Sequence, residues 1–240
     1  MGWVFDLDGV VWLGDQVIPG APEALAGLRA AGEPLVFVTN NSYVPRLDVA
    51  AKLTRFGIDP GADGADVVTS AMAAATLVQP GARDELERRG AVVVEHGSAD
   101  AVVVGYDPGF DYDRMRVAVA AVREGARLVA TNDDATYPTP TGVIPGGGAI
   151  LASVVTGSGT AATVAGKPYA PMTDLVRSLV GTEGVAVGDR PDTDGRFARA
   201  LAFRFALVLS GVTRAEDLPV EPEPEVVAAD LAELVRVLRP

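Results

Sequence analysis

Short apolar runs alternate with stretches of helical periodicity along most of the chain. "WVFDL" at residues 3–7 has the continuous apolar character of a buried strand, and "PEALAGLRAAG" at residues 22–32 has the pattern of a helix that ends at a glycine. The alternation repeats with the strand-like "PLVFVTNNS" at residues 34–42 and the helix-like "VPRLDVAAKLTRFG" at residues 44–57. Strands separated by helices predict βαβ units and a parallel sheet.

The middle of the chain has a different pattern. "GAVVVEHGSADAVVVGYD" at residues 90–107 places two apolar runs close together, and a predicted helix with Asp111 as its N-cap follows. "ARLVATNDDATYPTPTGVIPGGGA" at residues 126–149 reads as a strand that runs into a long loop rich in Pro, Thr and Gly. Because long loops inside compact domains are usually functional, this loop is a candidate for substrate contacts.

The first pattern then returns. "GVAVGD" at residues 184–189 is strand-like and ends in an acid, and "EPEVVAADLAELVRVLRP" at residues 223–240 predicts a final helix. The fold class is therefore α/β, with one domain interrupted by another. We predict a discontinuous core at residues 1–75 and 166–240, with a smaller α/β domain inserted at residues 76–165.

Composition narrows the possible partners. The 240 residues carry a formal net charge of −12, so nucleic acid and anionic membranes are not expected as partners. The sequence has no cysteine, which excludes disulfides and thiolate metal sites. Neither a signal-peptide pattern nor an apolar run long enough to cross a bilayer is present, and a cytoplasmic location is the prediction.

Polar groups follow the predicted strands in four segments: "DLDGV", "VTNNS", "AGKP" and "VGDRPDTD". Each segment alone has an ordinary explanation as a turn, a helix cap or a solvent-exposed lysine. In an open parallel sheet, however, ligands bind at the carboxyl ends of the strands, where these segments would meet.

Taken together, the four segments fit one chemistry. Carboxylates that converge repel one another unless a divalent cation lies among them, and ligands made only of oxygen suit Mg²⁺. A lysine with nearby hydroxyl and amide donors would bind an anion on that cation, and phosphate matches best. One carboxylate could then attack phosphorus, and the next could exchange a proton with the leaving oxygen and with water.

The order Asp-x-Asp-Gly, Thr-Asn-Asn-Ser, Gly-Lys-Pro and Gly-Asp-Arg-x-x-Thr-Asp resembles the haloacid dehalogenase-like (HAD) phosphohydrolases. It is most similar to the branch with an α/β cap inserted after the second motif, which includes 4-nitrophenyl, phosphoglycolate and pyridoxal phosphate phosphatases. The resemblance covers nearly the whole chain and implies a Rossmann-like core.

The resemblance also implies roles for individual residues. Asp6 would be the nucleophile, forming an aspartyl-phosphate, and Asp8 the general acid and base. Asp6, the backbone carbonyl of Asp8 and Asp189 would hold Mg²⁺, and Asp194 would orient water beside the ion. The phosphoryl oxygens would be bound by Thr39, Asn40 or Asn41, and Lys167. The implied activity is hydrolysis of small phosphorylated metabolites.

In the cap, the resemblance points to "TNDDATYPTPTG", where Asn132, Asp133 and Tyr137 are candidates for contacting the leaving group. For any one of them, a surface loop stiffened by proline is an equal alternative. Relatives usually carry an additional strand where this chain runs from Gly81 directly into a predicted helix. His96, the only histidine, lies outside every motif and is predicted to be a surface residue. Caps of this type often pair, so a homodimer through the cap is possible.

Two other classes of protein use similar residues. A receiver-type phospho-acceptor switch shares the acids, a hydroxyl, a lysine and Mg²⁺, but it is a single domain about half as long and lacks an acid placed like Asp8. A non-catalytic binding protein on a HAD core would be expected to have lost motif acids, and all are present here. The phosphatase interpretation is therefore favoured.

Overall fold

The computed structural model describes residues 1–77, 99–139 and 142–239. Contacts divide the chain into two compact units. The first comprises Met1–Thr39, Arg46–Val68 and Lys167–Pro240, and the second Asn40–Pro45 and Thr69–Gly166. Residues 40–45 and 69–75, which the sequence prediction placed in the core domain, therefore group with the second unit.

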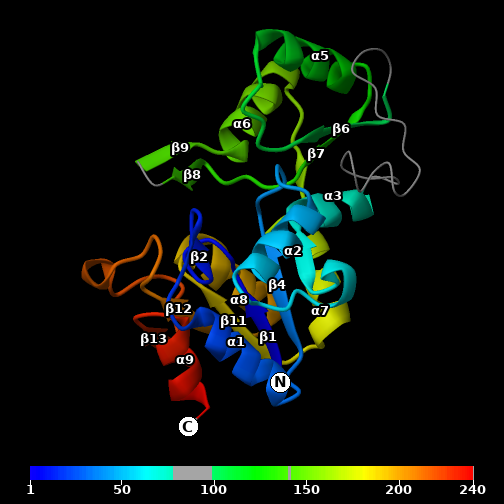
Figure 1. The fold of residues 1–240 in the computed structure, drawn as a ribbon. Coiled ribbons are helices and arrows are strands. Elements are labelled where there is room, and N and C mark those ends of the chain that lie inside the picture. Colours follow the sequence, from blue (N-terminus) through cyan, green and yellow to red (C-terminus); the bar gives the residue numbers. More distant parts are fainter. Residues whose placement is uncertain (78–98, 140–141, 240) are drawn as a thin grey trace. The chain divides into compact units, whose positions relative to one another are not determined.

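A six-stranded sheet forms the centre of the first unit (Figure 1). Its order is β13 (Val226–Ala228), β12 (Arg204–Val208), β11 (Gly184–Gly188), β1 (Gly2–Phe5), β4 (Leu35–Thr39) and β5 (Val67–Thr69). β1 pairs in parallel with both β4 and β11, and β12 pairs in parallel with β11 and β13. The predicted parallel sheet is confirmed.

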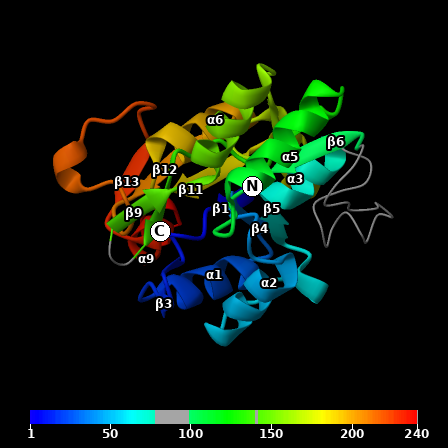
Figure 2. The same ribbon diagram turned by 90° about the horizontal axis from the view of Figure 1, so that it is seen from above.

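Helices pack against this sheet (Figures 1 and 2). α7 contacts β1 and β4, α8 contacts β11 and β12, and α9 contacts β12 and β13; in addition, α1 packs against α9 and α7 against α8. The helices of this unit are α1 (Ala21–Ala30), α2 (Arg46–Arg55), α7 (Ala170–Val180), α8 (Arg196–Leu201) and α9 (Leu231–Leu238), with short helical turns at Ala62–Gly64, Pro191–Gly195 and Ala215–Asp217.

Aromatic residues fill the centre of the sheet. The rings of Trp3 and Phe5 on β1 stack at 5.8 Å, and Phe5 lies 6.2 Å from Phe37 on β4. All three side chains are fully buried. This apolar strand centre is what places the polar residues at the strand ends, because only there can a side chain leave the core.

Two elements of the first unit differ from the sequence prediction. The segment expected to be one final helix begins as the strand β13, and only its second part forms α9. After β1 the chain also makes an unpredicted antiparallel hairpin of β2 (Trp12–Leu13) and β3 (Gln16–Val17). Pairing with a partner strand stabilises both elements, and such pairing leaves little trace in a short local sequence.

The second unit is a smaller α/β domain. Its three parallel strands follow the order β10 (Thr163–Val164), β7 (Arg127–Ala130) and β6 (Ala101–Val104). Its helices are α3 (Ser70–Leu77), α5 (Tyr112–Arg123) and α6 (Gly147–Ser158). Asp111 caps α5 as predicted, because its side chain accepts a hydrogen bond from the Arg114 amide at 2.9 Å.

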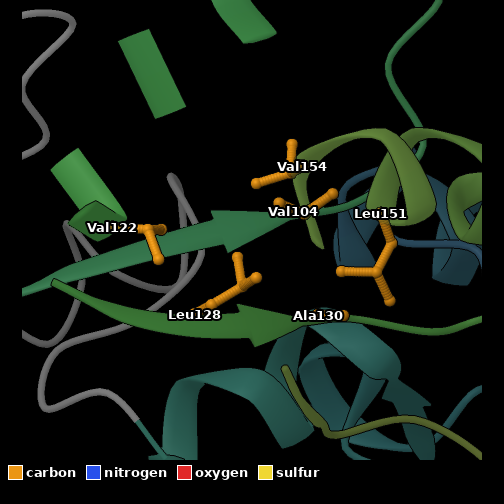
Figure 3. Close-up of a cluster of buried hydrophobic side chains, with 6 residues drawn as sticks. All are labelled: Val104, Val122, Leu128, Ala130, Leu151 and Val154. Carbon is orange, nitrogen blue, oxygen red and sulfur yellow. The ribbon is translucent and has the colours of Figure 1, made fainter. Parts of the chain in front are cut away.

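Aliphatic side chains from this sheet and its helices form the core of the second unit (Figure 3). Its buried members are Val104, Val122, Leu128, Ala130, Leu151 and Val154. The expected long loop after β7 instead contains an antiparallel hairpin of β8 (Thr136–Thr139) and β9 (Gly142–Pro145), followed by α6. The predicted helix after Gly81, and His96, lie outside the described residues.

No helix in the described part of the chain is long and apolar enough to cross a membrane.

Candidate active site

The topology of the first sheet determines where its functional side chains gather. From the central strand β1 the chain goes outward to β4 and β5, and later it returns to β11 on the other side of β1 and continues to β12 and β13. Ligand sites in such sheets lie at this reversal of strand order, beyond the carboxyl ends of the strands. Asp6 directly follows β1 and Asp189 directly follows β11, so both acids lie at that position.

Three carboxylates meet there. Asp6, Asp189 and Asp194 each offer an oxygen atom, and these atoms all lie within 4.8 Å of one another. Asp194 comes from the helical turn Pro191–Gly195 that leads into α8. We call these three residues the acid cluster. The Asp189 residue is only 2% exposed, so the cluster is built into the protein rather than displayed on its surface.

Lys167 lies between two members of the acid cluster. Its ammonium donates to Oδ1 of Asp6 at 2.5 Å and to Oδ1 of Asp194 at 2.7 Å, and its side chain is 4% exposed. Burial alone would lower the pKa of Lys167, but the negative charges of Asp194 and Asp6 outweigh that effect and raise it. The lysine is therefore a permanent positive charge at the site.

Asp6 and Asp189 lose their protons less readily than ordinary aspartates do, because their pKa values are raised. Burial raises the pKa of Asp6 well above its usual range; the Lys167 ammonium opposes this, while the charges of Asp194 and Asp189 add to it. Burial, together with the charge of Asp194, raises the pKa of Asp189 to about 7. Desolvation is the main cause of both shifts, and repulsion from neighbouring carboxylates adds to it.

A loop after β12 supports the cluster and was not identified from the sequence. The Val212 amide donates to Oδ2 of Asp189 at 2.6 Å, and the Thr213 hydroxyl donates to the Asp189 carbonyl at 2.6 Å. The Ser210 hydroxyl donates to the Gly9 carbonyl at 2.6 Å, which links this loop to the turn after Asp8. The available signal was "SGVT" at residues 210–213, which directly follows the apolar run "FALVL".

Two glycines allow this close packing. Gly9 has a φ of +86°, and a β-carbon there would collide with the Asp189 carboxylate. A β-carbon on Gly211 would collide with the same carboxylate. Asp189 is therefore enclosed on two sides by backbone that only glycine can supply.

Asp8 is not a member of the acid cluster, and its side chain has another partner. Its Oδ1 accepts a hydrogen bond from the indole Nε1 of Trp12 at 3.0 Å. Burial raises the pKa of Asp8, and the Trp12 hydrogen bond and the charge of Lys52 partly oppose this rise. A carboxyl group that keeps its proton more readily than usual is suited to donate that proton in a reaction.

The second motif lies across the boundary between the two units. Thr39 is the last residue of β4, is buried, and belongs to the first unit, so it lies at the same edge of the sheet as Asp6. Asn40 and Asn41 belong to the second unit. There Nδ2 of Asn40 donates to Asp134 at 3.0 Å, and Nδ2 of Asn41 donates to the hydroxyl of Tyr137 at 3.2 Å.

The cap candidates are therefore joined to the second motif inside one unit. Asn132 is 4% exposed and donates to the Asn40 carbonyl at 2.8 Å, whereas Asp133 is exposed. The ring of Tyr137 stacks on Tyr106 at 5.4 Å. Asn40 and Asn41 thus form one hydrogen-bonded cluster with residues about ninety positions later, here called the cap cluster; these partners are Asn132, Asp134 and Tyr137.

The residues of the acid cluster fit a divalent cation. The donors are all carboxylate oxygens, their spacing allows them to surround one ion, and negative charge exceeds the single ammonium of Lys167. Oxygen-only ligand sets suit hard ions such as Mg²⁺ and Ca²⁺. Fold and site together are those of an α/β protein with a group of acids, at the carboxyl edge of its parallel sheet, that could hold a divalent cation beside a buried lysine.

Comparisons with known proteins agree with this class. The family model described as haloacid dehalogenase-like hydrolase matches residues 3–105, and one described as HAD-hydrolase-like matches residues 164–234. Chronophin from Homo sapiens is 35% identical over 247 residues, which cover 90% of this chain and 83% of chronophin. The chain belongs to the haloacid dehalogenase-like hydrolases, in the branch of phosphatases with an inserted α/β cap.

Solved structures match over the full length as well. The 4-nitrophenylphosphatase from Thermotoga maritima superposes with a TM-score of 0.89 at 31% identity, covering 98% of this chain and 96% of that one. The glycerol phosphate phosphatase from Mycobacterium tuberculosis, solved in complex with magnesium, gives a TM-score of 0.86 at 35% identity, covering 97% of this chain and 75% of that one. The latter protein was also solved in complex with calcium.

Proposed function

We propose that this protein is a Mg²⁺-dependent phosphatase that hydrolyses small phosphomonoesters through an aspartyl-phosphate on Asp6. The observation that carries the proposal is the geometry around Asp6. This carboxylate at the carboxyl end of β1, whose side chain is 14% exposed, lies within reach of one ammonium and two further carboxylates. An anion bound beside Lys167 would place a phosphorus atom next to the Asp6 oxygen.

The reaction has two steps. In the first, an oxygen of Asp6 forms a bond to phosphorus, the bond to the leaving oxygen breaks, and Asp8 gives its proton to that oxygen. In the second, Asp8 takes a proton from water, the water oxygen bonds to phosphorus, and the bond to Asp6 breaks. Phosphate and free Asp6 are released, and Asp8 is protonated again. The raised pKa of Asp8 supports its role as the acid in the first step.

Asp6, Asp189 and the backbone carbonyl of Asp8 would hold the Mg²⁺ ion, with Asp194 beside them. When bound, the ion supplies positive charge that neutralises the phosphoryl oxygens. Lys167 adds the second positive charge, and Thr39 and an amide of Asn40 or Asn41 are proposed to bind the same oxygens. Positioning and charge neutralisation provide most of the catalysis in phosphoryl transfer.

The proposed substrates are small phosphorylated metabolites. The two solved structures named above are a 4-nitrophenylphosphatase and a glycerol phosphate phosphatase, whose substrates are small monoesters. We assign the choice among such substrates to the cap cluster and the adjacent Asp133, with Asn132, Asp133 and Tyr137 as candidates. Pairing of two chains through the cap stays a prediction.

Hydrolysis of 4-nitrophenyl phosphate by the purified chain tests the function. Activity should require Mg²⁺, vanish with EDTA and return when Mg²⁺ is added back. Asp6→Asn should lower kcat/KM by at least about a thousandfold, because it removes the nucleophile. Asp15→Asn is the matched control, since Asp15 follows the same motif but its side chain is 99% exposed. Full activity in EDTA, or an active Asp6→Asn variant, would refute the proposal.

A further inference from the structure

Trp12 makes a specific contact with Asp8 that the mechanism above does not use. The indole Nε1 donates to Oδ1 of Asp8 at 3.0 Å, and the Trp12 residue is only 4% exposed. An indole N–H can only donate, so this contact has one direction. In the sequence, Trp12 ends the apolar run "GVVW" and looks like an ordinary core residue.

Backbone hydrogen bonds also join Trp12 to the residues on either side of Asp8. The Gly9 amide donates to the Trp12 carbonyl at 2.7 Å, and the Trp12 amide donates to the Leu7 carbonyl at 3.2 Å. Residues on both sides of Asp8 are therefore tied to Trp12, and the side chain of Trp12 is tied to Asp8 itself. Hydrogen bonds therefore join the indole and the turn that carries Asp8 into one closed loop.

The indole is in turn fixed by helix α2. Nζ of Lys52 lies 4.3 Å from the centroid of the Trp12 ring and donates to the Gly14 carbonyl at 2.7 Å, in the turn between β2 and β3. The ring of Phe56, the residue directly after the end of α2, lies 6.0 Å from the indole. A cation beside an aromatic ring is attractive, so Lys52 restrains both the ring and its hairpin.

We propose that Trp12 is a positioning residue for proton transfer by Asp8, and that Lys52 holds the indole in place. Oδ1 of Asp8 is occupied by the indole N–H, so Oδ2 is the oxygen that carries the proton to the leaving group. The bond also prevents rotation that would exchange the two oxygens. This inference rests on the proposed function, because it assigns a role within the same reaction.

A leaving-group comparison tests the role, with Trp12→Phe as the variant. Phenylalanine keeps an aromatic ring in the core but removes the N–H donor and makes the ring smaller, and the control below makes the same change in size. Glycerol phosphate needs a proton on its departing alkoxide, whereas 4-nitrophenolate leaves readily without one. We expect kcat/KM to fall about 10- to 100-fold for glycerol phosphate, a part of the contribution typical of general acids, and much less for 4-nitrophenyl phosphate.

Trp3→Phe is the matched control. Trp3 is the other tryptophan in the sequence, is fully buried on β1, and its Nε1 has no hydrogen-bond partner among the described residues. The same substitution there should lower both kcat/KM values by the same factor, if at all. If the ratio of kcat/KM for glycerol phosphate to kcat/KM for 4-nitrophenyl phosphate changes in Trp12→Phe and not in Trp3→Phe, Trp12 positions Asp8. If it changes equally in both variants, the proposal is wrong.

Lys52→Met provides a second variant should Trp12→Phe fold poorly in a thermal melt. It removes the ammonium beside the indole and should shift the substrate ratio in the same direction, by about threefold to tenfold; Lys52→Arg, which keeps the positive charge near Asp8, is its control and should shift the ratio less. If the parent enzyme is active and the ratio of kcat/KM between the two substrates is unchanged in these variants, only the proposed role of Trp12 is overturned, and the proposed function stands. A parent inactive on both substrates would overturn the proposed function, and this inference with it.

Discussion

Lys167 and Asp6 are 161 positions apart in the chain, yet Nζ of Lys167 lies 2.5 Å from Oδ1 of Asp6. The ammonium also reaches Asp194, so a single positive charge joins the first motif to the last. Removing it would leave the carboxylates of the acid cluster facing one another in a buried site. The ion pair of Lys167 with Asp6 should therefore contribute both to the stability of the first unit and to its catalytic activity.

Lys167→Met should therefore reduce both activity and stability. Loss of a charge that faces the phosphoryl group should lower kcat/KM by at least about 100-fold. Breaking a buried ion pair should cost about 3–5 kcal/mol in the free energy of unfolding, measured by urea denaturation without metal.

Arg199→Met is the control for Lys167→Met, because its ion pair with Glu221 is exposed on both sides. An exposed pair should contribute less than about 1 kcal/mol. Equal losses of stability in the two variants would contradict the assignment of Lys167 as the central charge.

Gly211→Ala should weaken metal binding without unfolding the protein. The added methyl group would collide with the Asp189 carboxylate, which must then move away from the acid cluster. Displacing a ligand in this way should raise the Mg²⁺ concentration needed for half-maximal activity by about 10- to 100-fold. Gly27→Ala, in the middle of α1 with open space around it, is the control. It should leave the Mg²⁺ requirement unchanged and add about 0.5–1 kcal/mol of stability.

Stability without metal should decrease as the pH rises. The pKa of Asp189 is raised from 3.8 to about 7, and that of Asp6 is raised as well, so the folded protein keeps protons that the unfolded chain releases. The stabilisation is complete below about pH 4 and is lost as the pH approaches 7, at up to about 1.4 kcal/mol per pH unit for each group.

The same titration makes the effect of Mg²⁺ depend on pH. Metal binding requires ionised carboxylates, so the increase in Tm caused by Mg²⁺ should be larger at pH 8 than at pH 5. Asp189→Asn should flatten the stability curve and reduce the Mg²⁺ effect. Asp192→Asn, whose side chain is 69% exposed, should change neither. A Tm that rises with pH in the absence of metal would argue against the raised pKa values of Asp6 and Asp189.

Tyr137→Ala should change which substrates are preferred. The substitution removes the partner of the Asn41 amide and the stack on Tyr106, and so disturbs the cap cluster while leaving the acid cluster intact. The ranking of kcat/KM across a panel of phosphorylated metabolites should shift, while 4-nitrophenyl phosphate is still hydrolysed. Tyr112→Ala, on an exposed side chain of α5, is the control. If both variants kept the parent ranking, specificity would have to be determined elsewhere.

The sequence by itself determined the parallel sheet and the residues that gather at its edge. Parallel strands buried on both faces are recognisable as apolar runs, and polar residues directly after such runs stand out. Asp6, Asp189 and Lys167 were found in this way, without knowledge of any distance. The cap of α5 by Asp111 was predictable for a similar reason, because capping depends on residues only three positions apart.

Only the tertiary structure decided which of these groups touch. Nothing in the local sequence indicates that the indole N–H of Trp12 donates to Asp8, or that the Val212 amide and the Thr213 hydroxyl donate to Asp189. β13 became a strand because β12 offers it backbone partners, although its residues precede a helix. Hydrogen bonds of this kind join residues far apart in the chain, and their strength comes from burial that the complete fold creates.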